Sequence, residues 1–221
     1  GYSNANKKIV YNNKECSFTP QKKMNRILLG TDPGRLANVE ITDASLPIYG
    51  ISFESETGII VDNFSFRGIS GIEYASIDKE MLKAIAEANS YDLIIFQYGV
   101  NVLYKPNDMD FNWYAKAISP IINNFKSSFP TADLLVVSTA DRAFKYDGEF
   151  KSAIGIDSLV KLQAKVAYDA DICFYNQFET MGGKNSIVNW AQRSPAFAGK
   201  DYVHPNHLGA AFLGEKLYER I

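Results

Sequence analysis

The feature that most constrains the fold is an alternation, from Gly58 onward, of short apolar runs with segments of helical length. The apolar runs have strand length, and apolar residues recur every three or four positions in the segments between them. Such an alternation is typical of α/β proteins built on a parallel sheet. The predicted elements are strands at 59–66, 92–98, 134–138 and 172–175, and helices at 74–89, 111–127, 158–169 and 205–221.

The run Leu93–Phe96 is apolar at every position, as is Leu134–Val137. Strands of a parallel sheet that helices cover on both faces have this pattern. We therefore expect both runs to be central strands. Cys173, inside the apolar run at 172–175, is expected to be a buried strand residue.

Residues 1–58 have a different character, with short β-prone pieces separated by Asn, Asp, Gly and Pro turn signals. This pattern predicts a small antiparallel β unit before the α/β part, so we expect a β-rich segment at 1–58 and an α/β domain at 59–221. The expected short strands lie at 8–11, 26–29, 39–41 and 48–53.

Charge and composition exclude several classes of protein. The formal net charge is −2 and no basic run dominates, which argues against a nucleic-acid partner. No apolar stretch is long enough to span a bilayer. Cys16 and Cys173 lack the Cys-x-x-Cys spacing of metal or redox motifs, and the sequence does not fix whether they pair. The start Gly1-Tyr-Ser has neither Met nor signal segment and suggests a processed or engineered beginning.

The strongest chemical signal is Asp201-Tyr-Val-His204-Pro-Asn-His207, which contains both histidines of the chain. A carboxylate three residues before a histidine can orient the imidazole as a general base. The positive end of the following helix, expected to have Pro205 at its first position, would keep that imidazole neutral. Two alternatives stay open: a helix-capping turn of about equal merit, and, with less support, a metal site of Asp201, His204 and His207.

Two further turns follow predicted strands. In Tyr98-Gly-Val-Asn101, the Asn101 amide can donate to a developing oxyanion, although an ordinary Asx turn uses the same residues. In Arg67-Gly-Ile-Ser-Gly71, Gly71 can present its backbone N–H, although a strand-to-helix turn alone also needs glycine. Ser70 does not lie in a Gly-x-Ser-x-Gly elbow, and we do not assign it as a nucleophile.

Together, Gly68–Gly71, Tyr98–Asn101 and Asp201–Asn206 resemble the second, third and fifth sequence blocks of the SGNH hydrolases, also called GDSL-like lipases or acylhydrolases. The resemblance implies a three-layer α/β/α sandwich with a mostly parallel, flavodoxin-like sheet. It also implies His204 as the catalytic base, Asp201 as its partner, Gly71 and Asn101 as the oxyanion hole, and neither metal nor organic cofactor. A small-molecule or polysaccharide ester would be the substrate.

The stretch Met181-Gly-Gly183, with Ser186 and Trp190, is similar to the branch containing peptidoglycan and carbohydrate O-acetylesterases. In that branch a β-sandwich resembling a carbohydrate-binding module is inserted after the first block. Residues 1–58 would then be the end of such an insert. The branch also implies secretion or a place in the periplasm or cell envelope.

The first block of the family, a strand followed by Gly-Asp-Ser with the nucleophile, is absent from these residues. The nearest approach is Gly30-Thr31-Asp32, where the order differs and Thr replaces Ser. Val102 also stands where many members have Asp. Two hypotheses follow: a serine esterase whose nucleophile lies upstream of residue 1, or a noncatalytic carbohydrate-binding or scaffold protein with a degenerate fold.

Overall fold

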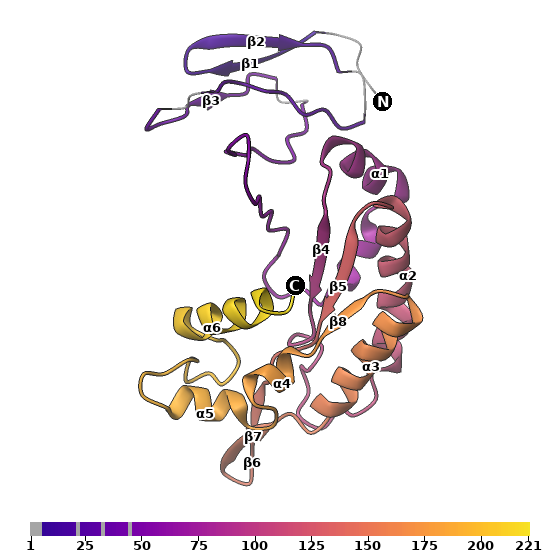
Figure 1. Ribbon diagram of the computed structural model, residues 1–221, viewed down its shortest axis with the longest axis vertical. Helices are drawn as coiled ribbons and strands as arrows, with labels where there is room; N and C mark the ends of the chain where they lie inside the picture. Colours follow the sequence, from indigo (N-terminus) through magenta and orange to yellow (C-terminus); the bar gives the residue numbers. More distant parts are fainter. Residues whose placement is uncertain (1–5, 21–22, 32–33, 44–45) are drawn as a thin grey trace. The chain divides into compact units, whose positions relative to one another are not determined.

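A computed structural model describes residues 6–20, 23–31, 34–43 and 46–221 (Figure 1). Ser3 and Asp32 lie outside the described residues. The chain divides into two compact units, which are considered separately below: Gly1–Ser65 with Lys83–Asn89, and Phe66–Leu82 with Ser90–Ile221. The predicted boundary between 58 and 59 stays a prediction.

The first unit contains a three-stranded antiparallel sheet with the strand order β2-β1-β3. Strands β1 (Lys7–Tyr11) and β2 (Lys14–Phe18) form a hairpin, and β3 (Val39–Glu40) pairs with the other edge of β1. Asn12 and Asn13, which join β1 to β2, both have positive φ, as tight two-residue hairpin turns require. The expected antiparallel β segment is thus present.

The strands predicted at 26–29, 48–53 and 59–66 are wrong, because these residues have no regular secondary structure. Apolar composition alone does not make a strand, which also needs a neighbour to pair with. Ile59, for example, is 89% exposed. Exposed large apolar side chains are numerous between residues 48 and 66.

The second unit has the predicted α/β fold with a parallel sheet. Strands β4 (Leu93–Gln97), β5 (Asp133–Val137) and β8 (Cys173–Tyr175) are parallel, with β5 in the middle. The register aligns the ends of β4 and β5, pairing Gln97 with Val137. The carboxyl ends of the strands therefore meet at one edge of the sheet, where ligands bind in open α/β folds.

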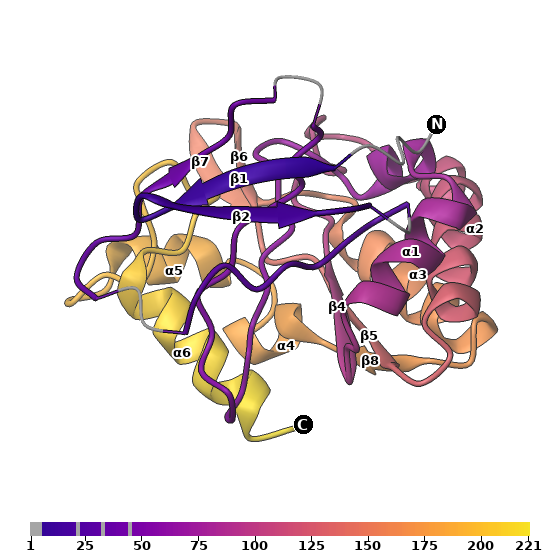
Figure 2. The same cartoon turned by 90° about the horizontal axis from the view of Figure 1, so that it is seen from above.

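Two long helices, α2 (Asn112–Ser128) and α3 (Ile156–Asp169), lie on the same side of this sheet (Figures 1 and 2). Both were predicted. Their buried side chains recur at helical spacing and form one core with the inward residues of the strands. That core includes Phe96, Tyr114, Ile118, Ile122, Val136, Leu159, Val160 and Val166.

The edge strands differ from the sequence prediction. Four of the five residues of β5 are buried, as expected for a central strand. In β4, by contrast, Leu93 is 37% and Ile95 41% exposed on one face of the sheet, and β5 is the only neighbour of β4 among the described strands. The prediction of a central β4 is therefore wrong for this structure. Cys173 lies in a strand as predicted, but it is exposed at the opposite edge, and both cysteines are free.

The remaining elements are two helical segments before β4, a hairpin after β5 and three helices after β8. The predicted helix at 74–89 is instead a 3₁₀ helix followed by an α-helix, and the closing helix begins at His207 rather than Pro205, because Asn206 caps it. A hairpin, β6 and β7, turns at Asp147-Gly148, both with positive φ. The bounds are η1 Ile72–Ser76, α1 Lys79–Ala88, β6 Ala143–Tyr146, β7 Glu149–Ser152, α4 Gln177–Met181, α5 Ser186–Gln192 and α6 His207–Tyr218.

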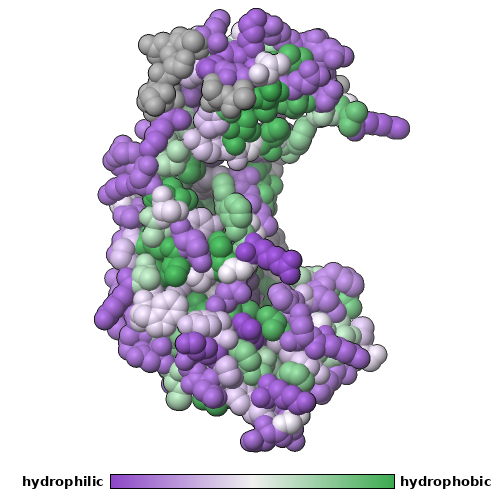
Figure 3. Space-filling view, turned by 180° about the vertical axis from the view of Figure 1, so that it is seen from behind, coloured by the Kyte–Doolittle hydropathy of each residue, from purple (hydrophilic) through white to green (hydrophobic). Residues whose placement is uncertain are grey.

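Among the described helices, none combines the length and the apolar character needed to cross a membrane. Hydrophobic and hydrophilic residues are interspersed on the face drawn in Figure 3.

Candidate active site

The predicted acid and base are in contact. His204 Nδ1 lies 2.7 Å from Asp201 Oδ2. The other carboxylate oxygen of Asp201 accepts the backbone N–H groups of Val203, at 3.0 Å, and His204, at 3.1 Å. Asp201 therefore fixes both the backbone and the ring of His204. A histidine bonded at Nδ1 to a carboxylate has its Nε2 available to take a proton.

The ionisation of Asp201 favours its contact with the His204 ring. Partial burial raises the pKa of Asp201, but the hydrogen bonds from the His204 ring and from the Val203 and His204 backbone outweigh it, so the pKa lies below its ordinary value. Asp201 is thus a carboxylate at neutral pH. The side chains of Asp201 and His204 are 51% and 77% exposed, so a reacting group can approach the imidazole from solvent.

The backbone around this pair is held by short-range bonds. Gly199 N–H donates to the His204 carbonyl at 2.9 Å, and Ala198 forms an isolated bridge with Pro205. The Asn206 side chain accepts the N–H groups of Leu208 and Gly209, so Asn206 rather than His204 caps α6. In the described part of the chain, no cluster of three His, Cys, Asp or Glu side chains is arranged to hold a metal ion.

The two predicted oxyanion turns also meet. Asn101 Nδ2 donates to the carbonyl of Ile69 at 2.8 Å, which leaves its second N–H for another acceptor. Gly71 has φ of 94°, and a Cβ at this position would lie 2.7 Å from the Tyr98 ring. Both the backbone conformation and the close approach therefore require glycine at 71.

The Gly71 N–H, however, already has an acceptor. The carboxylate of Glu73 accepts the N–H of Gly71 at 2.9 Å and that of Ser70 at 3.0 Å. The spacing Ser70-x-x-Glu73 is that of a capping box, and it could have identified this contact from the sequence. Two adjacent N–H groups on one carboxylate form an anion-binding nest. Gly71 can serve an oxyanion only after Glu73 moves away.

Side chains of the core hold the Gly71 and Asn101 turns in place. The Tyr114 hydroxyl donates to the Ser70 carbonyl at 3.0 Å, and burial raises the pKa of this phenol. Gln163 bridges the strand ends, because its amide donates to the Tyr98 carbonyl at 2.7 Å and accepts the Thr139 N–H at 2.9 Å. Tyr114 and Gln163 have helical positions, but no sequence motif points to their contacts with these turns.

The acid–base pair and the oxyanion turns are connected through consecutive residues of the segment after β5. Arg142 Nη1 donates to the Val100 carbonyl at 3.0 Å. The next residue, Ala143, donates its N–H to the Tyr202 carbonyl at 3.0 Å. In the described ranges, no hydrogen bond joins Asn101 or Gly71 directly to Asp201 or His204.

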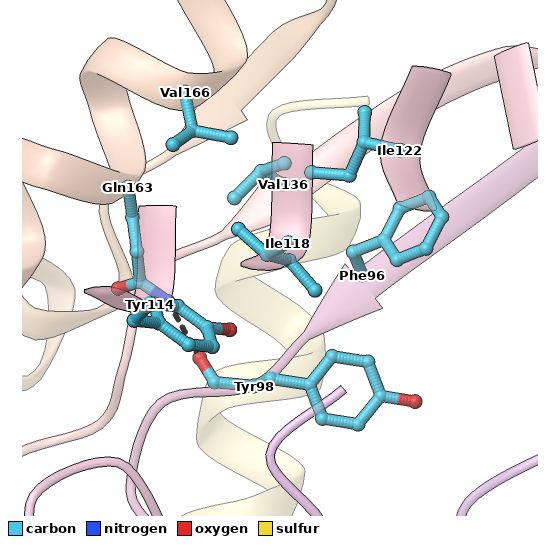
Figure 4. A pocket seen from close by; sticks show the side chains of 8 residues that line it. All are labelled: Phe96, Tyr98, Tyr114, Ile118, Ile122, Val136, Gln163 and Val166. Atoms are coloured by element: carbon cyan, nitrogen blue, oxygen red, sulfur yellow. Dashed lines mark hydrogen bonds between the residues drawn. The ribbon is translucent and has the colours of Figure 1, made fainter. Parts of the chain in front are cut away.

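A cavity of about 20 Å³ lies between the sheet and helices α2 and α3. It is lined by the eight residues drawn in Figure 4. Its walls are mostly apolar, with Tyr98 and Gln163 joined by a hydrogen bond at one end. A volume of this size holds about one water molecule. Since none of the four predicted site residues lines it, the cavity belongs to the core rather than to a substrate site.

Comparison with known proteins supports the fold. No protein-family profile and no curated protein matches this sequence. A solved structure of a peptidoglycan O-acetylesterase superposes with a TM-score of 0.59 at 21% identity, over 69% of this chain and 43% of that one. A Parabacteroides merdae ATCC 43184 protein described as a GDSL-like lipase superposes at 0.46 and 15% identity, over 63% and 62%. The predicted resemblance is confirmed at the level of the fold.

Proposed function

We propose that this chain supplies the acid–base pair and oxyanion donors of a serine ester hydrolase. The observation that carries the proposal is the 2.7 Å contact between His204 Nδ1 and Asp201 Oδ2. The fold shared with a peptidoglycan O-acetylesterase suggests O-acetyl groups of a carbohydrate as the ester, and the cell envelope or exterior as its location. Since the match spans less than half of that enzyme, activity belongs to the parent protein.

The proposed mechanism is acyl transfer through a serine. His204 Nε2 takes the serine proton while the serine oxygen attacks the ester carbonyl carbon, and Asp201 stabilises the imidazolium. Asn101, and Gly71 once Glu73 has moved, donate to the oxyanion. The tetrahedral intermediate expels the alcohol, which takes the proton from His204, and a water molecule then hydrolyses the acyl-enzyme by the same steps.

The open edge of β4 offers a place for the missing nucleophile. Asp133 N–H donates to the Asp92 carbonyl, so alternate N–H groups of β4, those of Leu93, Ile95 and Gln97, face away from β5. A parallel strand added there would end beside Asn101, and its own side chains would flank the exposed Leu93 and Ile95 side chains. We propose that this strand comes from the parent protein upstream of residue 1 and ends in the nucleophilic serine.

A noncatalytic carbohydrate-binding or scaffold role is the second candidate. The observation that favours it is the occupied N–H of Gly71, because Glu73 there takes the position an oxyanion would need. A protein that binds without cleaving has no need of a free oxyanion donor. In that case Asp201 and His204 would form a structural turn.

The deciding experiment is hydrolysis of 4-nitrophenyl acetate by the upstream-extended protein, its His204→Ala variant and the 221-residue chain. Labelling with a fluorophosphonate probe, which needs an activated serine, excludes acylation of surface lysines. We expect turnover and labelling only in the extended wild-type protein. Neither turnover nor labelling in any of the three would overturn the esterase and favour the binding role.

A further inference from the structure

Arg142 follows β5 after four buried residues. Its guanidinium is half-buried, donates through Nη1 to the Val100 carbonyl at 3.0 Å, and lies 4.8 Å from the centre of the Phe144 ring. Among the described residues, its buried Nε has no hydrogen-bond partner. In the described part of the chain, the contacts of this guanidinium are therefore the Val100 carbonyl and the Phe144 ring.

Val100 immediately precedes Asn101, so Arg142 holds one side of the turn that presents the Asn101 amide. The other side is held by Gln163 on the Tyr98 carbonyl and by the contact of Gly99 with Thr139, whose Cβ would lie 2.5 Å from a Cβ at 99. Gln163 and Gly99 fix the turn to the sheet. Arg142 adds a side-chain contact from the residue directly before Ala143, whose N–H reaches the acid–base turn.

That second contact is made by the neighbouring residue. Ala143 N–H donates to the Tyr202 carbonyl, and Tyr202 adopts a positive φ of 55° directly after Asp201. The Tyr202 ring packs on Phe150 of β7, with ring centres 4.2 Å apart. Since Arg142 and Ala143 are bonded neighbours, any shift at one is passed to the other within one peptide unit.

We infer that Arg142 is a positioning residue, which sets the distance between the Asn101 amide and the His204 imidazole by clamping the Val100 carbonyl. The inference rests on the proposed esterase function for its kinetic consequence, but not for its structural one. Arg142 acts through Val100 and is not itself placed on the substrate. Without the clamp, the Asn101 amide would be displaced relative to His204, while substrate binding elsewhere would be unaffected.

The structural arm uses the 221-residue chain and the NMR resonances of the Asn101 side-chain amide, identified by their loss in Asn101→Ala. We expect Arg142→Met to shift or broaden both of them, and Arg142→Lys, which keeps a donor and the charge, to restore part of the wild-type position. Arg193→Met is the matched control, because Arg193 also lies over a ring, that of Phe197 at 3.8 Å, but is exposed. Unchanged Asn101 resonances in folded Arg142→Met would overturn the inference.

The kinetic arm uses the upstream-extended protein, with active sites counted by fluorophosphonate labelling so that misfolded molecules are excluded. For Arg142→Met we expect kcat per labelled site to fall about tenfold or more with KM nearly unchanged, since small misplacement of a catalytic group is costly. Arg142→Lys should recover part of kcat. Wild-type kcat in Arg142→Met contradicts the inference. Absence of activity in the wild-type protein contradicts only the proposed function, because the NMR arm still reports on the clamp.

Discussion

The two halves of the site are built in different ways. Asp201 and His204 are three residues apart and are joined by bonds within their own turn. Asn101 and the Gly71 turn lie 32 residues apart at their contact, on separate segments that the core holds together. The proposed acid–base pair therefore depends on local chain geometry, whereas the proposed oxyanion donors depend on the packing of β4, α2 and the segment after β5.

The largest effect is expected from removal of the proposed base, His204. In the upstream-extended protein, His204→Ala should lower kcat for 4-nitrophenyl acetate by on the order of a millionfold, because the serine loses its proton acceptor. The control is His207→Ala, since His207 is an exposed residue at the start of α6. If His207→Ala were as damaging as His204→Ala, the assignment of the base would be wrong.

A smaller effect is expected from the oxyanion half. Asn101→Ala should reduce kcat by on the order of a hundredfold, the usual consequence of losing one oxyanion donor. Because the Asn101 side chain is exposed and, among the described residues, bonds to Ile69 alone, the fold should persist and the melting temperature should change little. Asn124→Ala, at an exposed position of α2, serves as the control. Kinetics equal to wild type would remove Asn101 from the site.

The same contrast explains what the sequence could predict about the site. The Asp201–His204 contact follows from spacing, and the strand-following positions of Asn101 and Gly71 were enough to bring them together. The roles of Glu73 and Arg142 were missed for different reasons. Glu73 has the capping-box spacing from Ser70, which is readable, but Arg142 reaches a carbonyl 42 residues away, and no local pattern encodes that.

At the level of the fold, strong periodicity predicted α2, α3 and β5 well, since each has a complete set of partners in the described structure. It also located β4, but the central position expected for β4 and the strand expected at 59–66 are not found in the described structure. An apolar run indicates that a strand is covered, but it does not indicate which segment covers it. The difference between the expected and the observed burial of β4 therefore suggests that a further segment packs on this strand.

An effect of intermediate size is expected at the open edge of β4. It distinguishes β4 from β5, which already has neighbours on both sides. In hydrogen–deuterium exchange, the N–H groups of Leu93 and Ile95 should exchange at least about tenfold more slowly in the upstream-extended protein than in the 221-residue chain. Val136 of β5, which has neighbours on both sides, should change little. Equal exchange of Leu93 and Ile95 in both proteins would show that no upstream strand pairs with β4.

The smallest expected effect separates two aspartates near the carboxyl end of the sheet. Asp141 is fully buried, and one of its oxygens accepts the Ile187 N–H at 3.0 Å and the Ser186 hydroxyl at 3.3 Å. Burial raises the pKa of Asp141 despite these bonds, whereas the hydrogen bonds on the exposed Asp201 lower its pKa. The two carboxyls should therefore make opposite contributions to the pH dependence of stability.

For Asp141, the folded protein holds its proton more tightly than the unfolded chain, so stability is greatest below the ordinary pKa and falls as pH rises through the raised one. Thermal melts of the 221-residue chain between pH 3 and 7 should show the melting temperature of Asp141→Asn rising relative to wild type across that interval, by on the order of a few degrees.

For Asp201 the sign reverses: its contribution to stability is present above the ordinary pKa and is lost as pH falls through the lowered one. Asp201→Asn should thus be less stable than wild type above the ordinary pKa, and the difference should shrink as pH falls through the lowered one. Parallel curves for Asp141→Asn and wild type would mean that the buried carboxyl is compensated by contacts beyond Ser186 and Ile187.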